Sequence, residues 1–253
     1  MPLSIDLSGQ TILVTGASRG IGAAIARTLG QAGARVAVHY GRSHDEAQAL
    51  ANEIGNGSEA FAADLADPSA CATLWQAVVS RFGAVDAVVN NAGIAIESPI
   101  SYPTDDWTRD WDLTMTVNVT ATALLCRSAL DHFAGRGGRI VNIASRAAFR
   151  GDTPDYLAYA ASKAAVVALT RSIARGFGKQ GVKAFILAPG FTRTDMAQAF
   201  IDQYGEAFAM GDIALDRLTE PQDIAPTVAF LLSGLADHAT GTSIDLNGAS
   251  YVR

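Results

Sequence analysis

The sequence of 253 residues predicts one α/β domain, built on a doubly wound, parallel seven-stranded sheet with helices on both faces. Short β-rich runs alternate with helix-length stretches throughout, most of the short runs are continuously hydrophobic, and no linker or repeat interrupts them. Continuously hydrophobic strands are typical of a sheet covered on both faces. Strand–helix alternation implies right-handed crossovers between parallel strands, so we expect a single domain over residues 1–253.

Each expected strand is a short apolar run that lies between helix-length stretches. The strands are Thr11–Thr15, Arg35–Tyr40, Glu59–Ala63, Ala87–Asn90, Arg139–Ala144, Lys183–Ala188 and Ser243–Leu246. The helices are Gly20–Gln31, Asp45–Ile54, Ser69–Arg81, Asp105–Phe133, Asp155–Gly176 and Pro221–Leu232. Pro226 falls inside the last helix and lacks a backbone N–H, so we expect a kink or a late helix start there.

Residues 191–219 form the longest stretch without a clear strand. The segment mixes two glycines with apolar and aromatic side chains, namely Phe191, Phe200, Ile201, Tyr204, Phe208 and Met210. An insertion that follows the end of a strand often forms a lid over a substrate. The alternative is a small helical excursion that packs only for stability.

The composition limits the expected partners and location. A net charge of −6 without a basic cluster argues against nucleic acid as a partner, and four scattered histidines show no metal-ligand spacing. Cys71 and Cys126 lie far apart in helical segments, so we expect no disulfide and a reducing cytoplasm. The first nine residues lack a signal-peptide pattern, and no apolar run reaches the roughly 20 residues of a membrane span, so no membrane partner is expected.

A glycine-rich segment directly follows the first strand and opens the first helix. Its candidate cofactor-binding residues are Gly16, Ser18, Arg19, Gly20, Ile21 and Gly22. Glycines let the backbone turn tightly and approach a pyrophosphate, while a helix N-terminus offers free amides and a positive dipole. In this context the segment predicts a dinucleotide site. A bare glycine turn is the alternative.

The end of the second strand bears on the choice of nicotinamide cofactor. Residues 38–43 contain no acid, whereas an NAD enzyme usually places one there to accept hydrogen bonds from the ribose. Arg42, beside Ser43, and Arg19 would instead make charge-assisted hydrogen bonds to a 2′-phosphate. The sequence therefore favours NADP(H) over NAD(H). A solvated loop charge is the alternative for Arg42.

Two further segments follow strands that end at the same edge of the sheet. Asp64 and Leu65 follow the third strand, where a carboxylate can accept from the adenine amino group. Asn91, Ala92 and Gly93 follow the fourth strand, and small residues there let the chain pass close to a nucleotide. Ligands bind at the carboxyl ends of strands in open parallel sheets.

Tyr159 and Lys163 are four residues apart, which places both side chains on one face of a helix. A tyrosine alone has a pKa of about 10, and a neighbouring cation moves that pKa toward the range needed for proton transfer. Ser145, fourteen residues before Tyr159, ends the fifth strand and could hydrogen-bond a substrate carbonyl oxygen. Asn118 is polar in the middle of a long helical stretch, where it is either a functional or a satisfied core amide.

In this order and spacing, these motifs resemble the classical short-chain dehydrogenase/reductase family over nearly the whole chain. The segment Pro189-Gly190-Phe191-Thr192-Arg193-Thr194 after the sixth strand belongs to the same pattern. The resemblance implies a Rossmann fold, in which Pro189, Gly190, Thr192 (through its backbone) and Thr194 contact the nicotinamide side of the cofactor.

The resemblance also implies a role for each catalytic candidate. Tyr159 would act as general acid in reduction and as base in oxidation. Lys163 would bind the nicotinamide ribose and lower the tyrosine pKa, so that both residues also belong to the cofactor site. Ser145 would orient and polarise the substrate oxygen, and Asn118 would hold a water that links Lys163 to solvent.

Two features depart from the family pattern. The interval from Ser145 to Tyr159 is about one residue longer than usual and includes Pro154, which suggests an altered loop beside the pocket. Ala249 stands where the family commonly has a glycine, in a segment that borders a subunit contact in relatives. A homotetramer is expected, with a dimer as the alternative.

The leading functional hypothesis is an NADP(H)-dependent reductase that converts a ketone to a secondary alcohol. Residues 40–43 and 90–93 most resemble 3-oxoacyl-acyl-carrier-protein reductases, which would make a carrier-bound acyl chain a possible substrate. The basic candidates for docking such a carrier are Arg127, Arg136, Arg171 and Arg175, unless they are ordinary solvated charges. The pocket candidates are Phe149, Phe191, Tyr204 and Phe208 as apolar walls, with Arg146 or Arg150 facing an anionic group.

Two alternatives remain open from the sequence. One is an NAD-dependent secondary-alcohol dehydrogenase of the same family, because the same residues serve the reverse reaction. The other is a non-catalytic dinucleotide sensor, since a fold alone does not confer activity. Such a sensor would be expected to lack Tyr159, Lys163 or Ser145, and all three are present.

Overall fold

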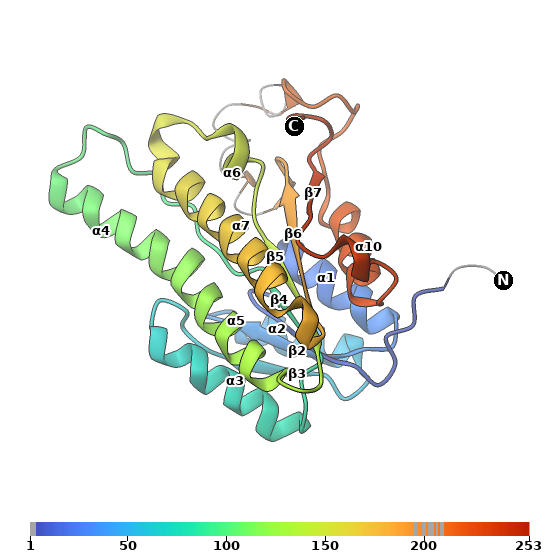
Figure 1. The fold of residues 1–253 in the computed structure, drawn as a ribbon. Coiled ribbons are helices and arrows are strands. Elements are labelled where there is room, and N and C mark those ends of the chain that lie inside the picture. Colours follow the sequence, from blue (N-terminus) through green and yellow to red (C-terminus); the bar gives the residue numbers. More distant parts are fainter. Residues whose placement is uncertain are drawn as a thin grey trace.

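Seven parallel strands form one sheet in the order β3-β2-β1-β4-β5-β6-β7 (Figure 1). The computed structural model describes residues 4–194, 197, 198, 201, 205, 207 and 210–252. The strands are β1 (Thr11–Val14), β2 (Arg35–Tyr40), β3 (Glu59–Ala62), β4 (Ala87–Asn90), β5 (Gly138–Ile143), β6 (Val182–Pro189) and β7 (Ser243–Leu246). Each predicted strand is confirmed, with ends that agree within one residue.

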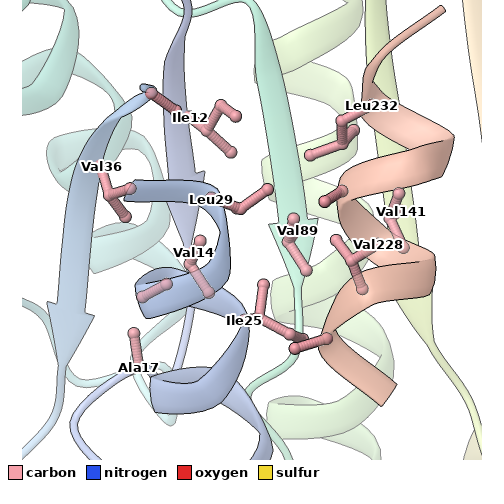
Figure 2. Close-up of a cluster of buried hydrophobic side chains, with 14 of the residues drawn as sticks. Ile12, Val14, Ala17, Ile25, Leu29, Val36, Val89, Val141, Val228 and Leu232 are labelled. Atoms are coloured by element: carbon pink, nitrogen blue, oxygen red, sulfur yellow. The ribbon is translucent and has the colours of Figure 1, made fainter. Parts of the chain in front are cut away.

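Helices cover both faces of the sheet, as predicted. One face carries α1 (Gly20–Gln31), α2 (His44–Ile54) and α10 (Pro221–Leu232), and the other carries α3 (Pro68–Phe82), α5 (Ala121–His132) and α7 (Leu157–Phe177). Within β1, Ile12 and Val14 pack into the first layer and Leu13 into the second, because successive side chains of a strand alternate between faces. Figure 2 shows Ile25 of α1 and Val228 of α10 directed toward the strands.

The strand order places a crevice at the carboxyl ends of β1 and β4. The chain winds outward through β2 and β3, then returns to start the second half of the sheet at β4, beside β1. Loops that leave neighbouring strands in opposite directions open such a crevice, which is where open α/β sheets bind ligands. All the loops that the sequence singles out begin at this edge.

The long helical stretch predicted over Asp105–Phe133 is divided in the structure. It consists of α4 (Thr104–Met115), the π-helix η1 (Thr116–Thr120) and α5. By length and composition, Thr104–His132 is also the one helix within the described residues that is long and apolar enough to cross a membrane. The core helix of a soluble protein satisfies the same criterion, and α5 packs against α3 in the second layer.

Several local features differ from the prediction. Helix α10 begins at Pro221 and includes Pro226, so the expected late start is wrong; Glu220 and Asp223 form a capping box that fixes the start one turn earlier. A short helix, α6 (Ala147–Arg150), and three 3₁₀ turns within the described residues, η2 (Pro154–Tyr156), η3 (Gly178–Gln180) and η4 (Asp237–Ala239), were also not predicted. Both α6 and η2 lie between Ser145 and Tyr159, the interval that the sequence suggests is altered.

Ala249 adopts a left-handed backbone conformation, with φ of +58°. A side chain with a Cβ is strained in that region, whereas glycine adopts it readily. Ala249 therefore keeps a backbone conformation that glycine adopts more readily, at the position where the family commonly has a glycine.

The segment after β6 folds over the carboxyl edge of the sheet. In its described part, Phe191, Met210 and Ile213 pack around buried Ile201 and Leu218. Thr192 pairs with Thr219, so the start and the end of the segment meet. Phe200, Tyr204 and Phe208, which the sequence suggests as lid or pocket residues, lie outside the described residues.

Candidate functional site

Two glycines where β1 leads into α1, Gly16 and Gly22, have no room for a side chain. Gly16 has a φ of +61°, and a Cβ there would lie 2.9 Å from the Cα of Ala92. A Cβ on Gly22 would lie 2.3 Å from the carbonyl oxygen of Gly16. These contacts make a cradle of bare backbone, which is the shape that a pyrophosphate needs for close approach.

The end of β4 holds this loop in place through side-chain hydrogen bonds. Asn91 donates from Nδ2 to the carbonyl oxygens of Thr15 (2.9 Å) and Gly16 (3.1 Å). The Thr15 hydroxyl oxygen in turn accepts from the backbone N–H of Asn91 and of Ala92. The predicted roles of Asn91 and Ala92 at the cofactor site thus coincide with a structural role, because both shape the loop.

His39, which the sequence does not single out as functional, connects three of the cofactor segments. The ring is 2% exposed, and its Nδ1 accepts from the backbone N–H of Gly16 at 3.0 Å. Its Nε2 lies 3.1 Å from the carbonyl oxygen of Ala63, so this nitrogen carries the proton and donates it. Burial lowers the pKa of His39, which keeps the ring neutral and able to accept. The only signal in the sequence is a polar residue that directly follows the apolar run Val36-Ala37-Val38.

We expect His39→Leu to weaken dinucleotide binding and destabilise the fold by about 1–3 kcal/mol, because the Gly16 N–H loses its buried acceptor. His39→Asn should lose less dinucleotide affinity and less stability than His39→Leu, because the asparagine amide oxygen can accept the hydrogen bond that Nδ1 accepts in the wild type. The lowered pKa of His39 means that the unfolded chain binds more protons than the folded chain below about pH 6.5. The wild-type protein should therefore lose stability as the pH falls below that value, and His39→Asn should lose less.

Chemical denaturation at about pH 7.5 and about pH 5.5, on either side of the ordinary histidine pKa, measures this difference. His132 also has a lowered pKa, but it is present in both proteins and cancels in the comparison. An equal loss of stability in wild type and His39→Asn would contradict the role assigned to the neutral ring.

The first turn of α1 faces the same cradle. It has no side-chain cap and no acidic residue, whereas the first turns of α2, α4 and α10 all contain carboxylates and α3 is capped by Asp67. Its amides and dipole therefore remain available to an anion. Thr194, from the segment after β6, approaches Gly20, because a Cβ on this glycine would lie 3.3 Å from the threonine methyl.

The remaining predicted cofactor residues lie around the cradle. Arg19 and Arg42 are exposed, and Ser43 begins α2 at the end of β2. Asp64 accepts a hydrogen bond from the N–H of Ala66, and Leu65 is buried beneath it. Ser18 and Ile21 are partly buried, and Ile21 packs against the first core layer.

Tyr159 and Lys163 lie one turn apart on α7, as predicted, with the Lys163 ammonium 5.7 Å from the centre of the tyrosine ring. Lys163 is 5% exposed, and its Nζ donates to the carbonyl oxygen of Ile143 at 3.0 Å, at the end of β5. Burial lowers the pKa of Lys163 from 10.5 to about 8. A buried lysine with one carbonyl partner is a strained arrangement that a purely structural role does not require.

Ser145, two residues after the end of β5, interacts with the hydroxyl of Tyr159 in a way that lowers the tyrosine pKa. The pKa of Tyr159 is nevertheless raised, because burial outweighs the lowering effect of Ser145, and the charge of Asp152 adds to the increase. In the protein alone, the expected lowering of the tyrosine pKa by Lys163 is therefore not seen. Ser145 also accepts from the N–H of Ala147 at 3.1 Å, so the start of α6 fixes its orientation.

Asn118 occupies the π-helix and is 1% exposed. Its amide exchanges two 2.8 Å hydrogen bonds with the backbone of Ile94 and donates to Ser162 Oγ at 2.9 Å. A Cβ on Gly93 would lie 3.2 Å from both Asn118 Oδ1 and Lys163 Nζ. The segment that follows β4 therefore lies against the side chain of Lys163. Single π-turns occur often at functional sites.

The segment after β6 closes the opposite side of the site. Pro189 ends β6, and a Cβ on Gly190 would lie 2.7 Å from the Cα of Asn247, so only glycine fits there. Thr192 is 6% exposed and donates from its hydroxyl to the carbonyl of Gly190. The structure therefore brings the predicted residues from the ends of β1, β4, β5 and β6 to one edge of the sheet, facing α7.

Known proteins are similar to this chain over nearly its whole length. A family model described as enoyl-(acyl carrier protein) reductase matches residues 16–248. The 3-oxoacyl-[acyl-carrier-protein] reductase of Vibrio cholerae is 35% identical over 249 residues, which cover 98% of this chain and 100% of the relative. A short chain dehydrogenase from Burkholderia cenocepacia, solved in complex with NADP, has a TM-score of 0.88 and 38% identity, covering 96% of this chain and 98% of that one. A 3-ketoacyl-(acyl-carrier-protein) reductase from Brucella melitensis, complexed with NADH, has a TM-score of 0.88 and 30% identity, covering 98% of this chain and 100% of that one.

Proposed function

The chain belongs to the short-chain dehydrogenase/reductase family of oxidoreductases, and from this premise we propose that it reduces the ketone of a 3-oxoacyl-type or other carbonyl compound to a secondary alcohol with NADPH. One observation carries the proposal. Ser145, Tyr159 and Lys163 meet at the carboxyl edge of the sheet, beside a glycine cradle that a dinucleotide fits. A dinucleotide bound there supplies the hydride for carbonyl reduction.

The chain's own residues supply orientation and the proton. The Tyr159 hydroxyl donates its proton to the carbonyl oxygen, and Ser145 directs a hydrogen bond to the same oxygen. Asn118 and Ser162 form a polar path behind Tyr159, because Ser162 Oγ donates to the carbonyl of Tyr159 and accepts from the Asn118 amide. Lys163 lies between this path and the end of β5, where it would bind the ribose of the cofactor and support proton supply to Tyr159.

The preference for NADP(H) rests on the end of β2. The strand ends at Tyr40, and the first acid after it is Asp45, inside the first turn of α2. Arg42 is exposed at this edge, where its guanidinium suits a 2′-phosphate. The solved relatives contain either NADP or NADH, so the family alone does not decide the cofactor.

The proposal is tested with purified protein, a 3-oxoacyl thioester and either NADPH or NADH, by following the absorbance of the reduced cofactor. We expect turnover with NADPH and a lower dissociation constant for NADPH than for NADH. Tighter binding of NADH would overturn the cofactor assignment. Oxidation of a secondary alcohol with NAD in place of this reaction would favour the dehydrogenase alternative.

The description of the matching family model favours a second candidate, reduction of the carbon–carbon double bond of an enoyl thioester. The closeness of the Ser145 and Tyr159 hydroxyls supports the carbonyl reaction instead, because two hydroxyl groups can then reach one carbonyl oxygen. A matched pair of 3-oxoacyl and 2-enoyl thioesters distinguishes the two reactions. Turnover of the enoyl substrate alone would exclude carbonyl reduction.

The protein partners also remain proposals. We infer a homotetramer, with a dimer as the alternative. The apolar helix Thr104–His132 supports an assembly, because only 39% of its most apolar 18-residue stretch is buried within one chain. For an acidic acyl carrier, Arg127, Arg171 and Arg175 are exposed, whereas Arg136 already pairs with Asp86 at 2.8 Å. Weaker binding of a carrier-bound substrate at rising salt is the expected sign of electrostatic docking.

A further inference from the structure

Arg146 directly follows the catalytic serine and has an incompletely partnered guanidinium. Its backbone N–H donates to the carbonyl of Pro189 at 2.9 Å, so the residue is fixed where β5 and β6 end. Its side chain is partly buried, and Nη1 is inaccessible to solvent and makes no hydrogen bond. A guanidinium donor that is shielded from water and unpaired is costly unless a ligand satisfies it.

The charges around Arg146 are arranged across the mouth of the site. Arg150 of α6 pairs with Asp212, from the segment after β6, at 2.7 Å, so this ion pair joins the two walls. Asp152 acts on both Arg146 and Tyr159, which places the arginine and the tyrosine in one electrostatic neighbourhood. Within the described residues, Arg146 has no carboxylate at ion-pair distance, whereas Arg150 has its own.

We propose that Arg146 binds an anionic group of the substrate, so that among small ketones this enzyme prefers oxo acids to neutral ketones. The inference rests on the proposed carbonyl-reductase function and specifies its substrate. Because Asp152 acts on both Arg146 and Tyr159, one substrate could present its carbonyl oxygen to the tyrosine and its acid to the guanidinium. The planar guanidinium forms paired hydrogen bonds with a carboxylate, and burial strengthens them.

The local charge balance favours a carboxylate over a phosphate monoester. Arg146 and Arg150 lie near Asp152 and Asp212, so these four groups together carry no net charge, and of the four only Arg150 and Asp212 form an ion pair within the described residues. A phosphate monoester carries about −1.5 to −2 charges at pH 7 and would leave an excess negative charge in the site. A carboxylate carries one negative charge and therefore leaves the smaller excess while it pairs with the Arg146 guanidinium.

The test compares 3-oxobutanoate with its methyl ester, two substrates that differ in charge but share the reacting ketone. We expect wild type to have a higher kcat/KM for the acid. Arg146→Met should lower the acid-to-ester ratio of kcat/KM by about 10- to 100-fold, as expected for loss of a charge-assisted hydrogen bond. Arg146→Lys keeps the charge but lacks the planar guanidinium. Its acid-to-ester ratio of kcat/KM should lie between those of wild type and Arg146→Met. Arg27→Met, on the exposed face of α1, is the matched control and should keep the wild-type ratio.

A binding measurement separates this inference from the proposed reaction. The protein saturated with NADPH is titrated calorimetrically with 3-hydroxybutanoate, which the reduced cofactor cannot oxidise. We expect wild type to bind it, and Arg146→Met to bind it about tenfold more weakly or more. Binding without reduction of the oxo acid would support Arg146 and contradict the reductase. The role of Arg146 would be overturned if wild type reduced the acid and the ester with equal kcat/KM. It would also be overturned if Arg146→Met lowered kcat/KM by the same factor for both substrates. If the protein neither binds 3-hydroxybutanoate nor reduces 3-oxobutanoate, both the role of Arg146 and the proposed reductase function are overturned.

Discussion

Tyr159→Phe is expected to lower kcat by about 10²–10⁴-fold, the range that positioned proton transfer contributes. The phenylalanine ring fills the same space on α7, so the loss should come from the missing hydroxyl and not from altered packing. Affinity for NADPH should change little, because the glycine cradle and the loop after β4 remain intact. Steady-state kinetics on a confirmed ketone substrate, together with a fluorescence titration of NADPH, measure both quantities.

The raised pKa of Tyr159 adds a second expectation to this experiment. Burial holds the hydroxyl protonated in the protein alone, which suits a general acid in reduction. Ser145→Ala removes the interaction that opposes this effect, so the tyrosine pKa should rise further and turnover should fall while the hydroxyl remains. Wild-type turnover in Tyr159→Phe would show that the proton comes from another group.

The sheet could be predicted because its signals are local. A run such as Val36-Ala37-Val38 is apolar on both faces, and only a sheet covered on both sides buries such a strand fully. The π-helix around Asn118 could not be predicted, because propensity does not distinguish it from the α-helix on either side. Its stability depends on Ile94 and Ser162, which are distant in sequence and meet Asn118 only in the fold.

The candidate site likewise has features that the sequence predicts and features that only the fold reveals. The glycine loop and the Tyr159–Lys163 pair are continuous motifs, and their order along the chain was enough to predict one shared edge of the sheet. The bonds of His39 to Gly16 and Ala63 depend on the register between β2 and its neighbours, which the sequence does not display. The partners of Arg146 and Arg150 likewise lie on separate elements, so the sequence could suggest the charges but not which one is paired.

Lys163→Met is expected to abolish efficient turnover and, at the same time, to stabilise the cofactor-free protein. Methionine is an unbranched apolar side chain of similar length, so it fills the buried space without the charge. A pKa lowered from 10.5 to about 8 corresponds to roughly 3 kcal/mol of destabilisation when the ammonium is charged in the fold. Loss of the hydrogen bond to Ile143 offsets about 1 kcal/mol of that, so a net gain of about 2 kcal/mol is expected at neutral pH.

The pH dependence of this gain identifies its cause. Because the folded pKa of Lys163 lies below the ordinary value, the unfolded chain binds more protons between about pH 8 and about pH 10.5. Wild-type stability contributed by this group should therefore rise with pH across that window, and the advantage of Lys163→Met should be full below about pH 8 and vanish near pH 10.5. Urea denaturation of both proteins from neutral to alkaline pH measures the difference. A gain that does not change with pH would indicate improved packing instead of a removed buried charge. A more stable but inactive variant would show that the buried lysine is retained for proton transfer at the expense of the fold.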